Sequence, residues 1–573
     1  MSLERLRKGL AKRGGPGIEA REWRGSVVLE GRAPDWKAKV ELGWYAAGFG
    51  FKGVVNDLEV EGVPRERLEG PSPGGAVLEG GRFDVAVVGG GVIGCAIARE
   101  LARWKISVIL LEKECDVAVH TSSRNDGMIH DGFAAKPGTL KARYNVRGNR
   151  LWGPLARELG IEFRRPGSLL LYGSRSAAAL YPLMAARAAE NGVEGWEFWS
   201  RARVRAEEPG APDEQHGGFF LPSAGVLSPY RATVALAESA AANGVRILLE
   251  TRVLGFETED ARITRVRTDR GTFSVGAVVN AAGNWADVVA GFANDRFFSL
   301  HQRRGVDLVL DAKAGGLQTR IMSIPNLLAS GARTKGGGLI VTTEDNVIVG
   351  PSATESPGRE DYATSQAETR ELERHFRVNR RLSPSMVITY FAGVRPCTYE
   401  EDFVVERSDY VRNLVHAAGI QSPGLASAPA IAEDVARYAI EALSERARVV
   451  PDAAFVAARR APVDPRRLSW EARAALVAER PDYGRVVCRC EGVSEGEIRD
   501  ALRASAAAGL GAASLDAVKR RTRAGAGRCH GGFCTPRVME IVADEAGIPL
   551  EAVTKKGAGS PVVVGRTKEA ARA

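Results

Sequence analysis

The sequence contains little cysteine: seven residues in a chain of 573, of which four form two close pairs. An odd total, and an N-terminus without a signal-peptide pattern, argue against a secreted fold held by disulfides. Disulfide-rich secreted domains are thereby excluded, and we expect a cytoplasmic protein.

Long apolar runs are also lacking. The longest, over residues 85–98, is interrupted by glycines and is shorter than the roughly 20 residues that cross a bilayer. The sequence therefore predicts no transmembrane segment and leaves only peripheral attachment to the cytoplasmic membrane through a partner.

A concentrated basic patch is absent as well, although the net charge is +9 and the isoelectric point about 9.2. The excess is spread over the N-terminal region, residues 446–467 and residues 519–528. Scattered basic side chains are typical of a solvated surface, so we expect no nucleic-acid partner.

Glycine, proline and cysteine are unevenly distributed and divide the chain. Its length allows about three to five domains. We expect a small α+β domain at 1–70, a linker at 71–82, an α/β body at 83–445, a connector at 446–467 and a helical, cysteine-bearing tail at 468–573.

The body opens with a nucleotide-binding pattern. An apolar run leads into Gly89, Gly91 and Gly94, helical spacing follows, and a second apolar run ends at Glu112. Glycines allow a tight turn and close approach of a pyrophosphate, the helix N-terminus attracts its charge, and an acidic side chain accepts from a ribose hydroxyl. The pattern predicts a Rossmann-like dinucleotide-binding domain.

Five later segments carry a specific resemblance. They are HTSSRNDGMIHDGFAAKPGTLKARYNVRGNRL (120–151), VVNAAGNWAD (278–287), TKGGGLIVTTEDNVIVGPSA (334–353), YFAGVRP (390–396) and GIQSPGLASAPAIA (419–432). In this order they resemble FAD-dependent dehydrogenases of the D-amino-acid oxidase superfamily, above all the large subunit of anaerobic glycerol-3-phosphate dehydrogenase and the L-2-hydroxyglutarate dehydrogenases. The resemblance implies an FAD-binding domain interleaved with a mixed-sheet substrate domain. The resemblance also implies that further residues contact FAD: Ser122, Ser123, Arg124, Asn125, Gly283, Gly419 and Gly424.

Oxidation of an alcohol beside an acid group needs a cation that fixes the acid and a base that takes the hydroxyl proton. By the resemblance, Arg395 binds a small anionic substrate through its guanidinium, and His130 is the base. The alternatives are a surface ion pair for Arg395 and a buried, hydrogen-bonded role for His130. Arg320 and Lys335 are further candidates for the same pocket.

The tail carries Cys488 and Cys490, then Cys529 and Cys534. These motifs resemble the bacterioferritin-associated-ferredoxin type of domain, in which four cysteines hold a 2Fe-2S cluster. Tetrahedral zinc on the same four thiolates is the main alternative. The spacing between the two motifs is 38 residues, longer than in that family, and residues 504–514 have the composition of an inserted loop.

The two cofactors together indicate a route for electrons, because a flavin accepts a hydride and can release electrons singly to a cluster. We expect a second redox subunit in a hetero-oligomer. Basic residues near the cysteines form either a rim that attracts an acidic partner or a solvated face: Lys519, Arg520, Arg521, Arg523 and Arg528. Two predicted strands around a helix with Trp44 resemble the small BON domain, and we expect the first 70 residues to help assembly.

The substrate is indicated by two segments that disagree. HDGFAAKPGTLKA (130–142) resembles the hydroxyglutarate group, whereas GIQSPGL and the cluster tail resemble the glycerol-3-phosphate subunit. We give domain organisation more weight and expect glycerol 3-phosphate, with a 2-hydroxy acid such as L-2-hydroxyglutarate, or an amino acid, as alternatives. A rival of another class is a non-catalytic electron-transfer or scaffold subunit, against which the intact motif residues speak.

Overall fold

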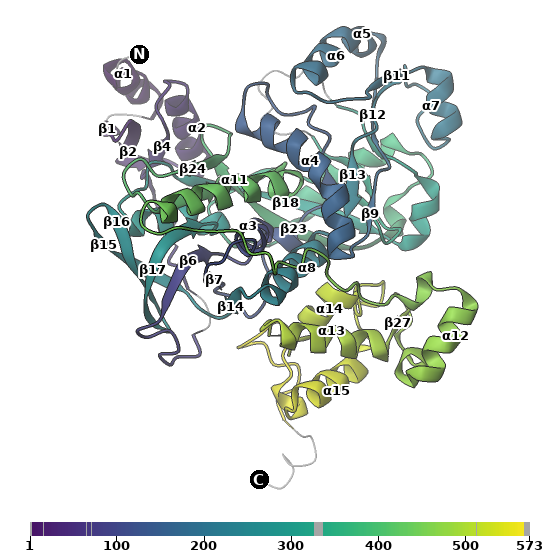
Figure 1. Ribbon diagram of the computed structural model, residues 1–573. Coiled ribbons are helices and arrows are strands. Elements are labelled where there is room, and N and C mark those ends of the chain that lie inside the picture. The colour runs from purple at the N-terminus through teal and green to yellow at the C-terminus, as the bar shows by residue number, and fades with distance from the viewer. Residues whose placement is uncertain are drawn as a thin grey trace.

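The structure is a computed structural model that describes residues 3–14, 17–64, 66–69, 72–325, 336–511 and 513–565. Figure 1 shows a central α/β body, with the N-terminal elements at one side and the C-terminal helices below α8. None of the helices that the structure describes is long and apolar enough to cross a membrane.

The N-terminal unit is a small sheet with two helices. Its elements are α1 (Leu3–Gly14), β1 (Glu19–Trp23), β2 (Ser26–Glu30), β3 (Arg32–Ala33), α2 (Trp36–Ala47), β4 (Val54–Asn56) and β5 (Glu59–Val60). β2 pairs antiparallel with β1 and parallel with β4. Helix α2 begins where the Asp35 carboxylate accepts a hydrogen bond from Ala38 N at 2.7 Å. The expected strand, helix and strand fall on β2, α2 and β4, whereas α1 and β1 have no clear sequence pattern. Membership of the BON family stays a prediction.

This unit is packed on the body through Tyr399. Asn56 Nδ2 donates to the Tyr399 hydroxyl at 3.1 Å, and the Tyr399 ring is buried in the hydrophobic core of the N-terminal unit. At the edge of the contact, Lys52 forms an ion pair with Glu406 at 2.7 Å. The N-terminal unit therefore sits directly on the oxidoreductase-like body rather than on a free tether.

An eight-stranded sheet forms one half of the body. Its strands are β6 (Arg82–Val88), β7 (Val108–Leu111), β14 (Arg246–Leu248), β15 (Val253–Glu259), β16 (Arg262–Thr268), β17 (Gly271–Asn280), β24 (Val404–Arg407) and β25 (Leu414–Ala418). β14, β7, β6, β17 and β25 run parallel, and β15 to β17 form an antiparallel meander. One face is covered by α3 (Val92–Leu101), α8 (Pro229–Ala242) and α11 (Gly424–Ser444). The other face is covered by the curled meander and α9 (Ala286–Phe292), so the parallel strands are apolar on both sides.

A nine-stranded mixed sheet forms the other half. Its strands are β10 (Ser168–Leu171), β11 (Glu197–Trp199), β12 (Gly218–Leu221), β18 (Leu300–Leu310), β19 (Ile321–Ser323), β20 (Gly338–Val341), β21 (Val347–Gly350), β22 (Thr354–Ser356) and β23 (Val387–Thr398). β10 and β19 pair in parallel, and the other described neighbours pair antiparallel.

The chain passes back and forth between the two sheets, which confirms the predicted interleaving of a Rossmann-like domain with a mixed-sheet domain. A small sheet of β8 (Met128–Ile129), β13 (Gly225–Leu227) and β9 (Phe163–Arg164) joins them. The remaining helices of the body are α4 (Leu140–Leu159), α5 (Arg175–Ala179), α6 (Tyr181–Glu190), α7 (Arg201–Glu207) and α10 (Gln366–Leu372).

The C-terminal unit is helical, as predicted. Its elements are α12 (Trp470–Glu479), β26 (Val486–Cys488), β27 (Val493–Ser494), α13 (Glu495–Ala507), α14 (Leu515–Thr522) and α15 (Thr535–Ala546). Helix α13 begins with a capping box, in which Ser494 and Glu497 each satisfy the other's backbone N–H. Arg523 Nη1, just after α14, donates to the hydroxyl of Tyr230 on α8 at 3.0 Å, so this unit lies against the body (Figure 1).

Candidate functional site

The glycine loop between β6 and α3 is shaped by close backbone contacts. Gly89 has φ +110°, and a Cβ there would lie 2.4 Å from Ala281 O. A Cβ at Gly94 would lie 1.9 Å from Gly89 O, so α3 packs directly on the loop. Gly91 is the N-cap of α3, and a Cβ there would come 3.1 Å from Ser122 Oγ. The N-terminus of α3 is thus left open at the end of β6, an arrangement that receives a pyrophosphate.

Glu112 follows β7 beside this loop. Its Oε2 accepts from Gly90 N at 2.6 Å, and its Oε1 accepts from Glu114 N at 2.9 Å. Burial raises the pKa of the carboxyl, and the two backbone N–H groups act against that rise. The carboxyl group is therefore held in one orientation, in which its oxygens can accept further hydrogen bonds from a ribose.

A cleft runs from the glycine loop across the carboxyl ends of β6, β7 and β17, where ligands bind in open parallel sheets. Five predicted cofactor residues line it: Gly89, Gly91, Glu112, Ser122 and Gly283. The sequence pattern missed other wall residues: Leu68, Thr251, Arg252, Val253 and Trp285. Leu68 belongs to the segment that enters the body from the N-terminal unit, and no local motif marks it.

The remaining predicted FAD contacts lie off this cleft: Gly94, Ser123, Arg124, Asn125, Gly419 and Gly424. The segment 121–125 packs between the cleft and β23, because Thr121 Oγ1 donates to Val394 O at 2.7 Å. The side chains of Ser123 and Asn125 bond the backbone of their own turn. Their role in this structure is to hold the shape of the segment.

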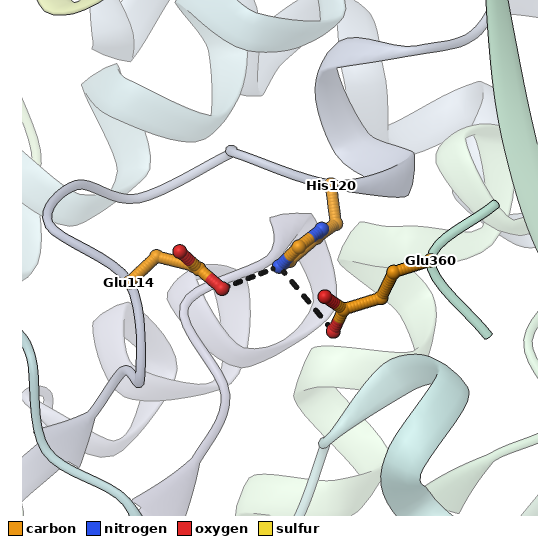
Figure 2. Close-up of side chains that lie close together, drawn as sticks. All are labelled: Glu114, His120 and Glu360. Carbon is orange, nitrogen blue, oxygen red and sulfur yellow. Dashed lines mark hydrogen bonds and ion pairs between the residues drawn. The ribbon is translucent and has the colours of Figure 1, made fainter. Parts of the chain in front are cut away.

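Three side chains at the cleft have the spacing of metal ligands: Glu114, His120 and Glu360, of which His120 and Glu360 line the cleft (Figure 2). His120 Nε2 lies 2.9 Å from Glu114 Oε1 and 3.8 Å from Glu360 Oε1. However, Lys113 forms ion pairs with both carboxylates, at 2.9 Å from Glu360 Oε1. Burial alone would raise the pKa of Glu114, but His120 and Lys113 lower it to about 2. The ammonium already supplies the positive charge, so the cluster is a rigid ion-pair network rather than a metal site.

Arg395 lies on β23 and its guanidinium covers Gly305 of β18. A Cβ at Gly305 would lie 2.4 Å from Arg395 Nη2. Nη1 and Nη2 donate to Ser352 O at 3.4 and 3.3 Å, long contacts to an uncharged carbonyl. Asp307 lies on β18, like Gly305. Burial raises the pKa of Asp307 well above its usual value, and Arg395 partly offsets that rise. The guanidinium therefore keeps most of its capacity for an anionic ligand.

His130 follows β8, and its Nε2 lies 3.3 Å from Ser422 Oγ. The neighbouring Gln421 Oε1 accepts from Cys397 Sγ at 2.9 Å. Cys397 is two residues from Arg395 and therefore on the same face of β23. The structure thus brings His130 and Arg395 to one region, although neither lines the cleft that starts at the glycine loop.

Arg320 does not belong to that region, which corrects the sequence-based assignment. Its guanidinium pairs with Glu207 at 2.7 Å and Glu208 at 3.4 Å, and stacks on Trp199 at 4.9 Å. Local acidic and aromatic partners thus hold it elsewhere. Lys335, the fourth candidate, lies outside the described residues.

A buried charged network beside Arg395 was missed. Arg303 of β18 is 3% exposed and pairs with Glu355 and Glu401, both at 2.6 Å. Burial would lower the pKa of Arg303, but its acidic partners and Cys397 raise it. The available signal was the run of polar and charged residues HQRR in the first half of this strand, because strands buried on both faces are usually apolar.

The four cysteines of the tail meet as two pairs, each with one residue from each motif. Cys490 Sγ lies 3.6 Å from Cys529 Sγ, and Cys488 hydrogen-bonds Cys534. Among the described residues, no three cysteine sulfurs lie within 4.8 Å of one another. A zinc ion with Zn–S bonds of about 2.3 Å would bring all four sulfurs within about 4 Å of one another. Two separate pairs instead suit two metal atoms with two thiolates each.

Three of the five basic residues near the cysteines face into the protein, which corrects the expectation that the whole run forms one docking surface or one solvated face. Arg520 and Arg521 both pair with the buried carboxylate of Asp116, each at 2.7 Å. The other two arginines have partners as well: Arg523 pairs with Glu491 and Arg528 with Asp311. Lys519 and Arg528 are exposed. Arg520, Arg521 and Arg523 dock the tail on the body.

Comparison with known proteins identifies both parts. Residues 84–438 match the FAD dependent oxidoreductase family, and residues 486–544 match the BFD-like 2Fe-2S binding domain. The chain belongs to the FAD dependent oxidoreductase family. The predicted cofactors, FAD and a 2Fe-2S cluster, are thereby confirmed.

Relatives of this oxidoreductase share most of its length. The glycerol 3-phosphate dehydrogenase of Caloramator mitchellensis is 37% identical over 489 residues, which cover 85% of this chain and 99% of the relative. The glycerol 3-phosphate oxidase of Mycoplasma pneumoniae is 30% identical over 62% of this chain and 94% of its own. The solved L-alpha-glycerophosphate oxidase of that organism, with FAD bound, superposes with a TM-score of 0.61 and 26% identity, over 67% of this chain and 100% of its own.

The residues of this oxidoreductase fit both groups. The α3 N-terminus, Glu112 and the cleft have the charge and shape that a dinucleotide needs. In the tail, backbone N–H groups of Gly525 and Glu491 point at Cys488, and those of Phe533 and Gly531 point at Cys529. Such N–H groups stabilise thiolates and tune a cluster's potential.

Proposed function

We propose that this oxidoreductase converts glycerol 3-phosphate to dihydroxyacetone phosphate. When bound, FAD accepts the hydride from the substrate's secondary carbon, and the 2Fe-2S cluster carries the electrons away one at a time. The observation that carries the proposal is the similarity to a glycerol 3-phosphate dehydrogenase over 99% of that relative.

Arg395 is the residue that we assign to the phosphate of the substrate. Its two long bonds to Ser352 O leave the guanidinium available, and a bidentate contact to a phosphate suits its geometry. The buried network around Arg303 is fully occupied by Glu355 and Glu401 and serves to keep this part of the sheet rigid.

His130 is the residue that we assign as base for the hydroxyl proton. Its imidazole stands beside Ser422, and a ring nitrogen of histidine can accept the proton of a substrate hydroxyl. The hydroxyl of Ser422 keeps the ring in one orientation, so that the proton is taken at a fixed nitrogen.

We further propose that electrons leave the cluster for a second redox subunit. Cys490 is exposed, and Phe533, between Cys529 and Cys534, is 87% exposed. Cys490 and Phe533 are both exposed, so the docking face that we propose is an apolar one centred on Phe533, in a hetero-oligomer that the N-terminal unit helps to assemble.

A second candidate substrate is L-2-hydroxyglutarate. An L-2-hydroxyglutarate dehydrogenase of Escherichia coli is 31% identical over 208 residues, which are 36% of this chain and 48% of the relative. Arg395 would then bind a carboxylate in place of a phosphate.

Anaerobic stopped-flow mixing of the purified holoenzyme with glycerol 3-phosphate, L-2-hydroxyglutarate, lactate and amino acids tests the proposal. We expect rapid bleaching of the flavin with glycerol 3-phosphate alone. Bleaching by L-2-hydroxyglutarate, with no response to glycerol 3-phosphate, would transfer the assignment to the second candidate.

A further inference from the structure

One buried carboxylate of the body binds two arginines of the tail. Asp116 is fully buried, and its Oδ2 accepts from Arg520 Nη2 and Arg521 Nη1, both at 2.7 Å. Its Oδ1 accepts from Arg521 Nη2 at 2.9 Å and from Val117 N at 2.9 Å. Burial would raise the pKa of Asp116, but the two guanidiniums lower it, so the carboxylate is charged in the folded protein.

Asp116 belongs to the loop that shapes the cofactor cleft. Glu112 and Ala118, on either side of it in sequence, both line the cleft, and Ala118 N donates to Gly90 O at 3.1 Å. Asp116 itself is not among the described residues that line the cleft. The same short segment contacts the helix α14 that precedes the second cysteine motif.

An apolar anchor lies beside this ion pair. Leu510, in the segment 504–514, is 1% exposed and packs in the body's main hydrophobic core with Val245 and Ile247. A Cβ at Gly511 would lie 3.3 Å from Cys115 O, so the backbone of the segment runs close to the cleft loop. The additional residues between the two cysteine motifs thus place Leu510 in the core of the body. This corrects the interpretation of the segment as a plain inserted loop.

Further contacts fix the tail at its other end. Arg523 Nη2 donates to Asn346 Oδ1 at 2.9 Å, and His530, next to Cys529, has its Nε2 2.8 Å from Ile388 O on β23. The connector is pinned as well, because Arg459 pairs with Glu238 at 2.5 Å. Polar and apolar contacts on several elements leave this unit one position on the body.

We propose that Asp116 and Leu510 lock the cluster-binding unit onto the flavin-binding body, and that Asp116 is a positioning residue for electron transfer between the two cofactors. The inference rests on the proposed electron route. It adds that this route requires the cluster-binding unit to keep one position on the body instead of moving relative to it. Removing the charge of Asp116 leaves two buried guanidiniums without their partner, which strongly disfavours the docked state.

The test uses the full-length holoenzyme and its Asp116→Asn variant. We expect faster amide hydrogen exchange in α14 and in residues 504–514, with unchanged iron and FAD content. After anaerobic mixing with glycerol 3-phosphate, bleaching of the flavin should keep its rate, and the following reduction of the cluster should slow by about tenfold or more, as expected for loss of a buried charge partner.

Asp544→Asn is the matched control, because Asp544 pairs at 2.6 Å with Arg499 of its own unit and is 66% exposed. It should leave exchange and cluster reduction unchanged. Leu510→Ala probes the second anchor by the same readouts and decides the question if Asp116→Asn fails to fold. Wild-type exchange and cluster reduction in both variants would overturn the proposal. A wild-type cluster that no substrate reduces would instead refute the proposed function, and amide exchange would still report on the dock.

Discussion

The guanidinium of Arg395 lies in space that Gly305 leaves by having no side chain, and among the described residues it donates to the carbonyl of Ser352. Arg395→Ala should raise the KM for glycerol 3-phosphate about 10- to 100-fold, because a charge-assisted contact contributes about 1.5 to 3 kcal/mol. The rate of flavin reduction at saturating substrate should change much less. Steady-state and stopped-flow kinetics measure the two effects separately.

Arg320→Ala is the control for this experiment, since Arg320 is also an arginine of the mixed sheet but is held by Glu207 and Glu208. It should leave the KM unchanged. An equal rise in KM for both variants would mean that Arg395 acts through the stability of the sheet and not through the substrate.

His375 makes the stability of the protein depend on pH. It is 8% exposed, and burial, with smaller effects of Arg374 and Arg377, lowers its pKa to about 4. Between about pH 6.5 and 4 the unfolded chain binds a proton that the folded chain does not, so stability falls as the pH falls through this range. A shift of this size corresponds to about 3 kcal/mol at the acid end.

His375→Gln removes this titration. The melting temperature of the variant, measured by calorimetry from pH 7 to pH 4, should fall less steeply than that of the wild type. Parallel curves would show that His375 titrates normally in the folded protein.

Helix α3 packs directly on the glycine loop, because Gly94 has no side chain that would collide with Gly89 O. Gly91→Val places a branched side chain toward Ser122 Oγ and into the cleft, and it should release most of the FAD while the protein stays folded. The ratio of flavin to protein absorbance after gel filtration measures the loss. Retention of one FAD per chain would contradict the assignment of this cleft.

Gly316→Ala serves as a control for that substitution, since a Cβ at Gly316 meets nothing within 4 Å and lies in the mixed sheet's half of the body. It should retain FAD like the wild type. Comparison of the two variants separates a blocked cleft from a general effect of replacing glycine.

Local patterns were predictable from the sequence, whereas partners distant in the chain were not. Gly89, Gly91 and Gly94 act within one turn, so their spacing alone indicates the loop. By contrast, Asp116 and Arg521 are separated by about 400 positions and meet only in the folded protein. No local rule distinguishes such an arginine from a solvated one, and the basic run was therefore assigned to the wrong surface.

The whole molecule joins a flavin-binding body to a cluster-binding unit on one chain. Deleting residues 468–573 should leave flavin reduction by substrate in place but abolish reduction of a one-electron acceptor. It should also lower the melting temperature, because Asp116 loses both arginines and the core around Ile247 loses Leu510. Anaerobic acceptor assays and calorimetry check the two effects.

Cys490→Ala is the matched control for the deletion, because it removes a cluster ligand at an exposed position and keeps the dock. Electron delivery to the acceptor should be lost as in the deletion, and the melting temperature should fall less than in the deletion, because the contacts of Asp116 and Leu510 with the other part of the chain remain. Full turnover of the deleted chain with oxygen, as fast as that of the intact protein, would show that the tail has no part in the reaction.

Leu510 packs in the main core of the body, so the two parts of the molecule share hydrophobic contacts that neither can keep without the other. Such sharing couples their unfolding, because loss of one part exposes apolar surface of the other. Heating should therefore give a single calorimetric transition for the flavin body and the tail, and chelation of the iron should shift that transition as a whole. Loss of the cluster should therefore destabilise the flavin body together with the tail. A chain without its cluster should then be open to proteolysis in both parts.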